Sequence, residues 1–177
     1  MIKEINGRKF KLLITSSDIA NKVQQLGKQI TEDYTGKNLL VVGILKGSFV
    51  FLSDLIRSIE TKTEIDFIRL SSYKNKMAPD DLELITDLGT RINNRDVLLV
   101  DDLLDTGGTL TYIRDIFLSR EPKSFKICTL IKKNKYREKN IDPDYVGFEI
   151  EDKFIVGYGT DFAEEGRNLP DIYVIED

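Results

Sequence analysis

The stretch between Val97 and Leu110 constrains the fold of this chain more than any other part of its sequence. It begins with four consecutive valine and leucine residues, which is typical of a strand buried on both faces of a parallel sheet. Acidic residues and a Thr-Gly-Gly-Thr turn follow, and Leu110, Ile113 and Phe117 then recur at the spacing of a helix face. This order of buried strand, glycine turn and helix predicts an α/β fold with a central, mainly parallel sheet flanked by helices.

The turn at residues 106–109 has the composition of a phosphate-binding site. Its two glycines allow backbone N–H groups to converge, its threonines add hydroxyl donors, and the following helix contributes its positive N-terminal end. Asp101 and Asp102 would repel a phosphate, so they suit sugar hydroxyls or a divalent cation. Together these groups fit a phosphorylated ribose. Composition alone favours an acidic, glycine-rich turn without a ligand, but the order of acids, glycines and threonines after a buried strand favours the ligand site.

The composition excludes several kinds of catalysis. The chain of 177 residues contains no histidine, which rules out Ser-His-Asp and Cys-His catalysis and histidine-based zinc sites. Its 41% hydrophobic and 32% charged residues are typical of one globular domain. The net charge of −4 argues against a nucleic-acid-binding surface. The sequence has neither an apolar run near the ~20 residues of a membrane span nor a signal-peptide core, so we expect a cytoplasmic protein with no membrane partner.

A second strand, glycine turn and helix starts at Leu39. The apolar run 39–45 predicts a buried strand, Lys46-Gly47-Ser48 forms the turn, and apolar residues between 52 and 59 trace a helix face. Lys46 either faces a second anionic group or is a solvated lysine at a helix start. The remaining patterns predict a helix over 18–34, a helix over 109–119, an edge strand or arm within 2–14, and strands over 63–71, 85–88, 125–131, 145–150, 154–158 and 172–175.

Two further segments carry a functional and a structural interpretation each. The polar segment 72–81 is long enough to be a lid over a site, or a hairpin connection without a function. The strand over 125–131 ends in Lys132 and Lys133. Lys132, at the carboxyl end of a parallel strand, is placed where sheets of this kind bind ligands, although a basic pair at a strand end is ordinarily structural.

Several motifs resemble those of one enzyme family. The segment from Val100 to Leu110 resembles the phosphoribosyl-pyrophosphate (PRPP) motif of the type I phosphoribosyltransferases. The segments 146–150, 152–154 and 156–158, with Asp161 and Arg167 behind them, resemble the C-terminal hood of the 6-oxopurine members, and 66–73 resembles the segment leading into their lid. The motifs follow in the expected order from about residue 39 onward. The chain therefore resembles the hypoxanthine-guanine phosphoribosyltransferases.

This resemblance implies a domain organisation. It implies a single phosphoribosyltransferase domain over residues 1–177, with a core at about 37–135, a hood formed by about 1–14 and 145–177, and a lid loop at about 71–83. It also implies a non-proline cis peptide between Leu45 and Lys46, and a homodimer or homotetramer.

The resemblance also implies a reaction: transfer of the 5-phosphoribosyl group of PRPP to N9 of hypoxanthine or guanine, giving the nucleotide (IMP or GMP) and pyrophosphate, with Mg²⁺ as cofactor. Such a reaction belongs to purine salvage. The implied roles are general base for Asp105; 5′-phosphate binding for Asp105, Thr106, Gly107, Gly108 and Thr109; ribose contacts for Asp101 and Asp102; magnesium binding for Asp101, Asp102 and Asp161; pyrophosphate binding for Lys46, Gly47 and Arg167; purine binding for Lys132, Phe154 and Ile155; and lid contacts for Ser72 and Tyr73.

Two other functions are compatible with these motifs. One is a non-catalytic PRPP sensor that binds nucleic acid, and the other is a salvage enzyme that prefers xanthine. The chain also departs from the family pattern twice, with Asp101 where a glutamate is frequent and Gly108 where some relatives carry lysine.

Overall fold

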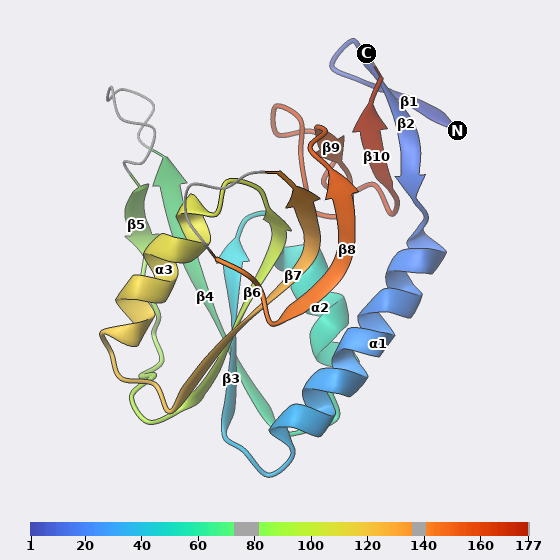
Figure 1. Cartoon of the computed structure of the whole chain (residues 1–177). Helices are drawn as coiled ribbons and strands as arrows, with labels where there is room; N and C mark the ends of the chain where they lie inside the picture. The colour runs from blue at the N-terminus through green and yellow to red at the C-terminus, as the bar shows by residue number, and fades with distance from the viewer. Residues whose placement is uncertain (73–81, 136–140, 177) are drawn as a thin grey trace.

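The structure is a computed structural model, and it describes residues 1–72, 82–135 and 141–176. The elements of this described part follow one another from the N-terminus to the C-terminus as Figure 1 shows. They are β1 (Ile2–Ile5), β2 (Arg8–Ile14), α1 (Ser16–Tyr34), β3 (Leu39–Leu45), α2 (Phe49–Arg57), β4 (Thr63–Ser72), β5 (Leu82–Thr86), β6 (Asp96–Leu104), α3 (Gly108–Leu118), β7 (Ser124–Asn134), β8 (Tyr145–Glu151), β9 (Ile155–Val156) and β10 (Ile172–Ile175).

A large sheet with the strand order β5-β4-β3-β6-β7-β8 forms the centre of the molecule. All neighbouring strands in it are parallel except the edge pair β4 and β5. Its strands β3 and β6 are buried almost throughout, as their continuous Val and Leu runs require when helices cover both faces. The predicted α/β fold with a mainly parallel sheet is confirmed.

The two faces of the large sheet belong to different core clusters. One cluster joins α1 and α2 to the sheet through residues such as Val41, Leu98 and Val100. The other joins α3 to the opposite face through residues such as Val42 and Leu99. Figure 1 shows the same arrangement, with α3 on one side of the sheet and α1 and α2 on the other. Below, these are called the α1/α2 face and the α3 face.

A second, antiparallel sheet forms the hood, with the strand order β1-β2-β10-β9. It contains the first and last strands of the chain, which both pair with β2, as Figure 1 shows. Its own small core lies around Phe10, Val156 and Tyr173. The predicted start of the hood at residue 145 is wrong, because β8 pairs in parallel with β7 and belongs to the large sheet. The short strand expected over 85–88 also lies earlier, since β5 spans Leu82–Thr86.

Asp101 and Asp102 lie within β6 rather than after it, because the strand continues to Leu104. The four apolar residues marked the buried centre of the strand and not its end. No helix in the described ranges 1–72, 82–135 and 141–176 is long and apolar enough to span a membrane.

Gly27 provides a test of the contact between α1 and α2. An alanine within a helix is ordinarily more stable than glycine by about 1 kcal/mol. A Cβ at Gly27, however, would overlap with the backbone carbonyl of Ser58 at the end of α2. We therefore expect Gly27→Ala to lower the free energy of unfolding by about 1 to 3 kcal/mol in urea denaturation. Gln25→Ala, on the exposed side of the same helix, is the control and should change it by less than about 0.5 kcal/mol; stabilisation by Gly27→Ala would contradict the packing.

Candidate functional site

A cavity of about 350 Å³ lies at the carboxyl ends of β3 and β6, beneath the hood. Its lining brings together residues from four predicted parts of the site: the β3–α2 turn, the end of β6, the start of α3 and the hood loop. These residues include Gly47, Asp101, Asp102, Thr109, Asp161 and Arg167. These six residues, which lie far apart in the sequence, therefore line one common space.

The carboxyl groups of Asp101 and Asp102 lie at the cavity wall, where Asp101 is buried and Asp102 is half-buried. Burial raises the pKa of both groups, and the neighbouring carboxylate raises that of Asp101 further. The backbone N–H of Asp102 donates to Oδ1 of Asp101 over 3.1 Å. A bound cation would favour the charged form of both groups, because opposite charge offsets the cost of burial.

The chemistry of these two carboxylates is compatible with magnesium. Within the described residues no group of three or more acidic, cysteine or histidine side chains is arranged to hold a metal ion alone. Mg²⁺ does not require such a cage, since it is usually bound by one or two carboxylates together with substrate phosphates and water. Asp161, the third predicted ligand, forms an ion pair with Arg167, with 2.6 Å between Nη2 of Arg167 and Oδ1 of Asp161.

Two glycines allow the hood loop to approach the core closely. A Cβ at Gly47 would overlap with the carboxylate of Asp102, and a Cβ at Gly159 would overlap with the carbonyl oxygen of Gly47. Gly159 also adopts φ = +102°, which side-chain-bearing residues rarely reach. The hood, the β3–α2 turn and the end of β6 are therefore in direct contact. The peptide between Leu45 and Lys46 is cis, as the resemblance implies.

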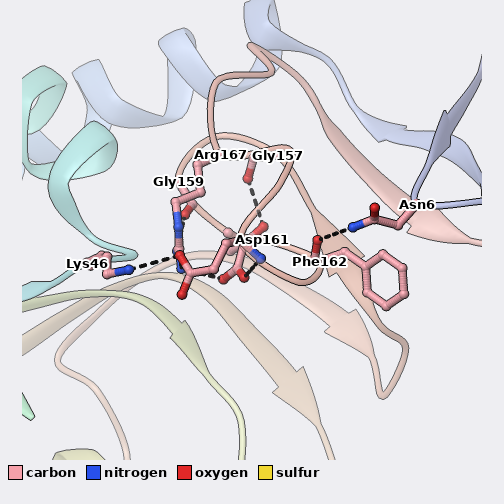
Figure 2. A network of polar contacts seen from close by, with 9 residues as sticks. Asn6, Lys46, Gly157, Gly159, Asp161, Phe162 and Arg167 are labelled. Carbon is pink, nitrogen blue, oxygen red and sulfur yellow. Dashed lines mark hydrogen bonds and ion pairs between the residues drawn. The ribbon is translucent and has the colours of Figure 1, made fainter. Parts of the chain in front are cut away.

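The hood loop holds Arg167 and contacts Lys46 through Glu164, which pairs with both cations; Figure 2 shows Lys46 beside this loop. Nη1 of Arg167 donates to the carbonyl oxygen of Gly159 over 2.8 Å, and its Nη2 pairs with Asp161. Nζ of Lys46 lies 2.9 Å from Oε2 of Glu164. Two of the residues predicted to bind pyrophosphate, Lys46 and Arg167, are thus parts of one network, although they lie far apart in the sequence.

The predicted phosphate-binding turn has the expected backbone. Gly107 precedes α3 with φ = +84°, so the turn uses a left-handed conformation that favours glycine. The N-terminal end of α3 and Thr109 face the cavity edge, where helix N–H groups favour an anion. Gly108 is the first residue of α3, so its missing side chain leaves the backbone of this turn accessible.

The structure does not bring Lys132 to Asp105; it brings Lys133. Nζ of Lys132 pairs with Asp142 over 2.7 Å and with Glu149 over 3.3 Å, whereas Nζ of Lys133 lies 3.5 Å from Oδ2 of Asp105. The ammonium group of Lys132, predicted to bind the purine, thus lies against two carboxylates away from Asp105. Sequence analysis treats Lys133 only as the second member of the basic pair at the strand end.

A slip in the side-chain alternation of β7 explains this difference. Alternation would place Leu130 and Ile131 on opposite faces, but both belong to the cluster on the α1/α2 face. Lys132 is paired with Leu104, which belongs to the α3 face. Lys133 therefore takes the face of Ile131, while strict alternation from Leu130 would have placed Lys132 there.

Two residues that sequence analysis missed complete the surroundings of Asp105. Asp152 pairs with Lys133 over 3.4 Å and with Lys135 over 3.2 Å, and Lys135 also pairs with Asp105. The hydrogen bond from Lys135 to Asp105 raises the pKa of the lysine, which keeps its positive charge at the site. The sequence signal was weak: Lys135 follows the strand and Asp152 lies in a charged turn.

The remaining predicted residues lie at the hood. Phe154 is half exposed, and its ring packs against Phe162 at 5.5 Å between centroids and against Phe10 at 6.5 Å. Ile155 is buried in β9 and pairs with β10. Of the two lid residues, Ser72 is the last residue of β4 and Tyr73 lies outside the described residues.

Tyr158 anchors the hood loop to α2. Its hydroxyl donates to Oδ2 of Asp54 over 2.5 Å, and its backbone N–H donates to the carbonyl oxygen of Leu169 over 2.8 Å. Tyr158 adopts φ = +48° in spite of its large side chain. This side chain therefore holds the loop that carries Arg167 against the helix that follows Lys46.

Comparison with known proteins identifies the class to which this fold and site belong. Residues 14–163 match the phosphoribosyl transferase domain family. The hypoxanthine-guanine phosphoribosyltransferase of Aquifex aeolicus is 43% identical over 99% of this chain and 100% of the relative, and that of Bacillus subtilis is 43% identical over 94% of this chain and 93% of the relative. The chain belongs to the phosphoribosyltransferase family, and within it to the group formed by these hypoxanthine-guanine enzymes.

Solved structures agree with this placement. A hypoxanthine phosphoribosyltransferase from Staphylococcus aureus superposes with a TM-score of 0.90 at 46% identity, covering 94% of this chain and 91% of that one. A hypoxanthine-guanine phosphoribosyltransferase from Bacillus anthracis, with a HEPES molecule in its active site, superposes with a TM-score of 0.89 at 41% identity, covering 99% and 100%.

The Tyr158–Asp54 contact can be measured with a double-mutant cycle. Tyr158→Phe and Asp54→Asn should each destabilise the protein, because each removes one partner of a hydrogen bond to a carboxylate. We expect a coupling free energy of about 1 to 2 kcal/mol in chemical denaturation. The cycle subtracts the separate ion pair between Asp54 and Arg57. A coupling below about 0.3 kcal/mol would show that the hydroxyl does not anchor the loop.

Proposed function

We propose that this protein transfers the 5-phosphoribosyl group of PRPP to N9 of hypoxanthine or guanine in purine salvage, releasing pyrophosphate. The cavity that joins the acidic end of β6, the N-terminal end of α3 and Arg167 carries the proposal, together with Lys46, which Glu164 links to Arg167, because these groups match ribose, phosphate and pyrophosphate. The names of the relatives support the choice of base. The relatives reported above lend no support to a nucleic-acid-binding regulator or a xanthine-preferring enzyme.

The proposed reaction forms the bond between C1′ of ribose and N9 of the purine and breaks the bond between C1′ and pyrophosphate. The pyrophosphate leaves with the electron pair of the broken bond, so its negative charge needs cationic partners. Lys46 and Arg167, together with the backbone at Gly47, would bind it. The turn 105–109 would bind the 5′-phosphate through N–H and hydroxyl donors, far enough away to hold the ribose between two anchors.

Asp101 and Asp102 would hold the ribose hydroxyls and, with Asp161, magnesium. Magnesium bound there would neutralise the oxygens of the leaving pyrophosphate. The burial of the two carboxyl groups supports a cation at this position. Because Asp161 is paired with Arg167, its part in metal binding would require that ion pair to open or be shared.

Asp105 would act as the general base that takes the proton from N7 of the purine. Lys133, rather than Lys132, would donate a hydrogen bond to the 6-oxo oxygen, since Lys133 is the lysine beside Asp105. An ammonium group has only donors, so the 6-amino group of adenine would leave it without a partner. Phe154 would stack on the purine ring and the backbone of Ile155 would contact its other edge. Ser72 and Tyr73 would belong to a lid that excludes water.

The assembly and the location of the protein stay predictions. We propose a homodimer or homotetramer in the cytoplasm, with PRPP and a 6-oxopurine base as partners and neither nucleic acid nor membrane. Size-exclusion chromatography with light scattering would test the assembly, and a monomer at micromolar concentration would contradict it.

A spectrophotometric assay tests the proposed function. Purified protein is incubated with PRPP, Mg²⁺ and, in parallel, hypoxanthine, guanine, xanthine or adenine. We expect Mg²⁺-dependent turnover of hypoxanthine, guanine or both, and none of adenine. Asp105→Asn should lower kcat by about a hundredfold or more, since general base catalysis contributes factors of this size. Turnover of xanthine alone would favour the xanthine-preferring enzyme, and PRPP binding without turnover of any base would favour the regulator.

The two adjacent lysines supply a matched test of base recognition. We expect Lys133→Met to lower kcat/KM for hypoxanthine and guanine by about tenfold to hundredfold, the effect of losing one charged hydrogen bond. Lys132→Met, a change of the same size at the neighbouring position, should have an effect below about threefold because Lys132 pairs with Asp142 and Glu149. The reverse order of effects would return the role to Lys132.

A further inference from the structure

The carboxylate of Glu164 lies between the two cations of the proposed pyrophosphate site. Its Oε2 is 2.9 Å from Nζ of Lys46 and 3.4 Å from Nη2 of Arg167. Lys46 comes from the β3–α2 turn and Arg167 from the hood loop, as Figure 2 shows. A single oxygen of this chain therefore bridges the groups that a pyrophosphate oxygen would bridge.

The backbone conformation at Glu164 is unfavourable for a glutamate. Phe162 and Glu165 exchange backbone hydrogen bonds of 2.9 and 3.1 Å, and the two residues between them, Ala163 and Glu164, adopt φ values of +51° and +68°. Two successive left-handed residues define a type I′ turn, which strongly favours Asn-Gly. An Ala-Glu pair at this turn is locally unfavourable. The conformation of the turn therefore does not explain why a glutamate stands at this position.

The turn is nevertheless firmly placed. Oδ2 of Asp161 accepts the backbone N–H of Glu164 over 2.8 Å, and Nδ2 of Asn6 donates to the carbonyl oxygen of Phe162 over 3.2 Å. The Glu164 side chain keeps 67% of its surface exposed, so it has solvent to move into when another anion takes its place. A fixed backbone with an exposed carboxylate is suited to an exchangeable contact.

We propose that Glu164 is an intramolecular competitor of the pyrophosphate group, which holds Lys46 and Arg167 together when no ligand is bound and weakens pyrophosphate binding. This proposal rests on the proposed function, because it takes the Lys46–Arg167 pair as the pyrophosphate site. An incoming pyrophosphate must displace the carboxylate from both cations. Its apparent affinity is reduced by the fraction of molecules in which Glu164 occupies them. The same competition speeds the departure of the product.

Isothermal titration calorimetry with inorganic pyrophosphate and Mg²⁺ tests the proposal on the full-length protein. Glu164→Gln keeps the size of the side chain and removes its charge, and Glu164→Asn also suits the left-handed turn. Both variants should bind pyrophosphate about threefold to tenfold more tightly, as expected when exposed ion pairs no longer compete. Their affinity for IMP, whose phosphate would bind at 105–109, should not change.

Glu165→Gln is the matched control, because it removes one exposed carboxylate from the adjacent position of the same turn. Unchanged or weaker pyrophosphate binding by the Glu164 variants overturns the proposal, as does equal tightening by Glu165→Gln, which would indicate a general charge effect. Lys46→Met and Arg167→Met separate the two levels of inference. If both leave pyrophosphate binding intact, the pyrophosphate site itself is wrong; if they weaken it and the Glu164 variants do not tighten it, only the competitor role fails.

Discussion

The site depends on one close contact, in which Gly159 lies against the backbone of Gly47 and Gly47 lies against the side chain of Asp102. Because neither glycine has room for a Cβ, the hood loop lies directly on the β3–α2 turn, and that turn lies directly on a carboxylate of β6. The hood sheet joins both ends of the chain, while the turn and β6 belong to the central sheet. This contact is what brings Arg167 and Asp161 into the same cavity as Asp101 and Asp102.

Most of the fold could be predicted from the sequence, because its strongest signals are local. Continuous Val and Leu runs marked β3 and β6, and the glycine turns after them marked the starts of α2 and α3. The boundary of the hood was not predictable in this way. The segment Tyr145–Glu151 alternates as an antiparallel hood strand would, yet it pairs in parallel with β7. This pairing joins segments that are distant in the sequence, so the local pattern does not reveal it.

Lys133 rather than Lys132 lies beside Asp105 for a reason that no local sequence pattern reveals. In β7, Leu130 and Ile131 both face α1 and α2, and in β6 Val100 and Leu103, three residues apart, do the same. The alternation of both strands therefore slips by one residue, and the strands remain in register with each other because both slip. A slip shared by neighbouring strands arises from their pairing. A single sequence shows the apolar residues but not the shared shift, so alternation counted from the buried centre would place Lys132 on the face that Lys133 occupies.

The basic and the acidic residues of the site differ in whether the chain itself provides them with an opposite charge. Each cation proposed to bind substrate already has an internal anion: Lys46 pairs with Glu164, Arg167 with Asp161 and Glu164, and Lys133 with Asp105 and Asp152. Within the described part of the chain, no ion pair within 4.0 Å joins a lysine or arginine to Asp101 or Asp102, whose pKa values are raised by burial. An anionic ligand must therefore exchange with carboxylates of the chain, at a modest net gain in free energy. A cation at β6 breaks no such ion pair and compensates the charge of two largely buried carboxyl groups. Binding of a polyphosphate together with a divalent cation is consequently favoured over binding of the polyphosphate alone, because the cation compensates the acidic half of the cavity while the phosphates compete for the basic half.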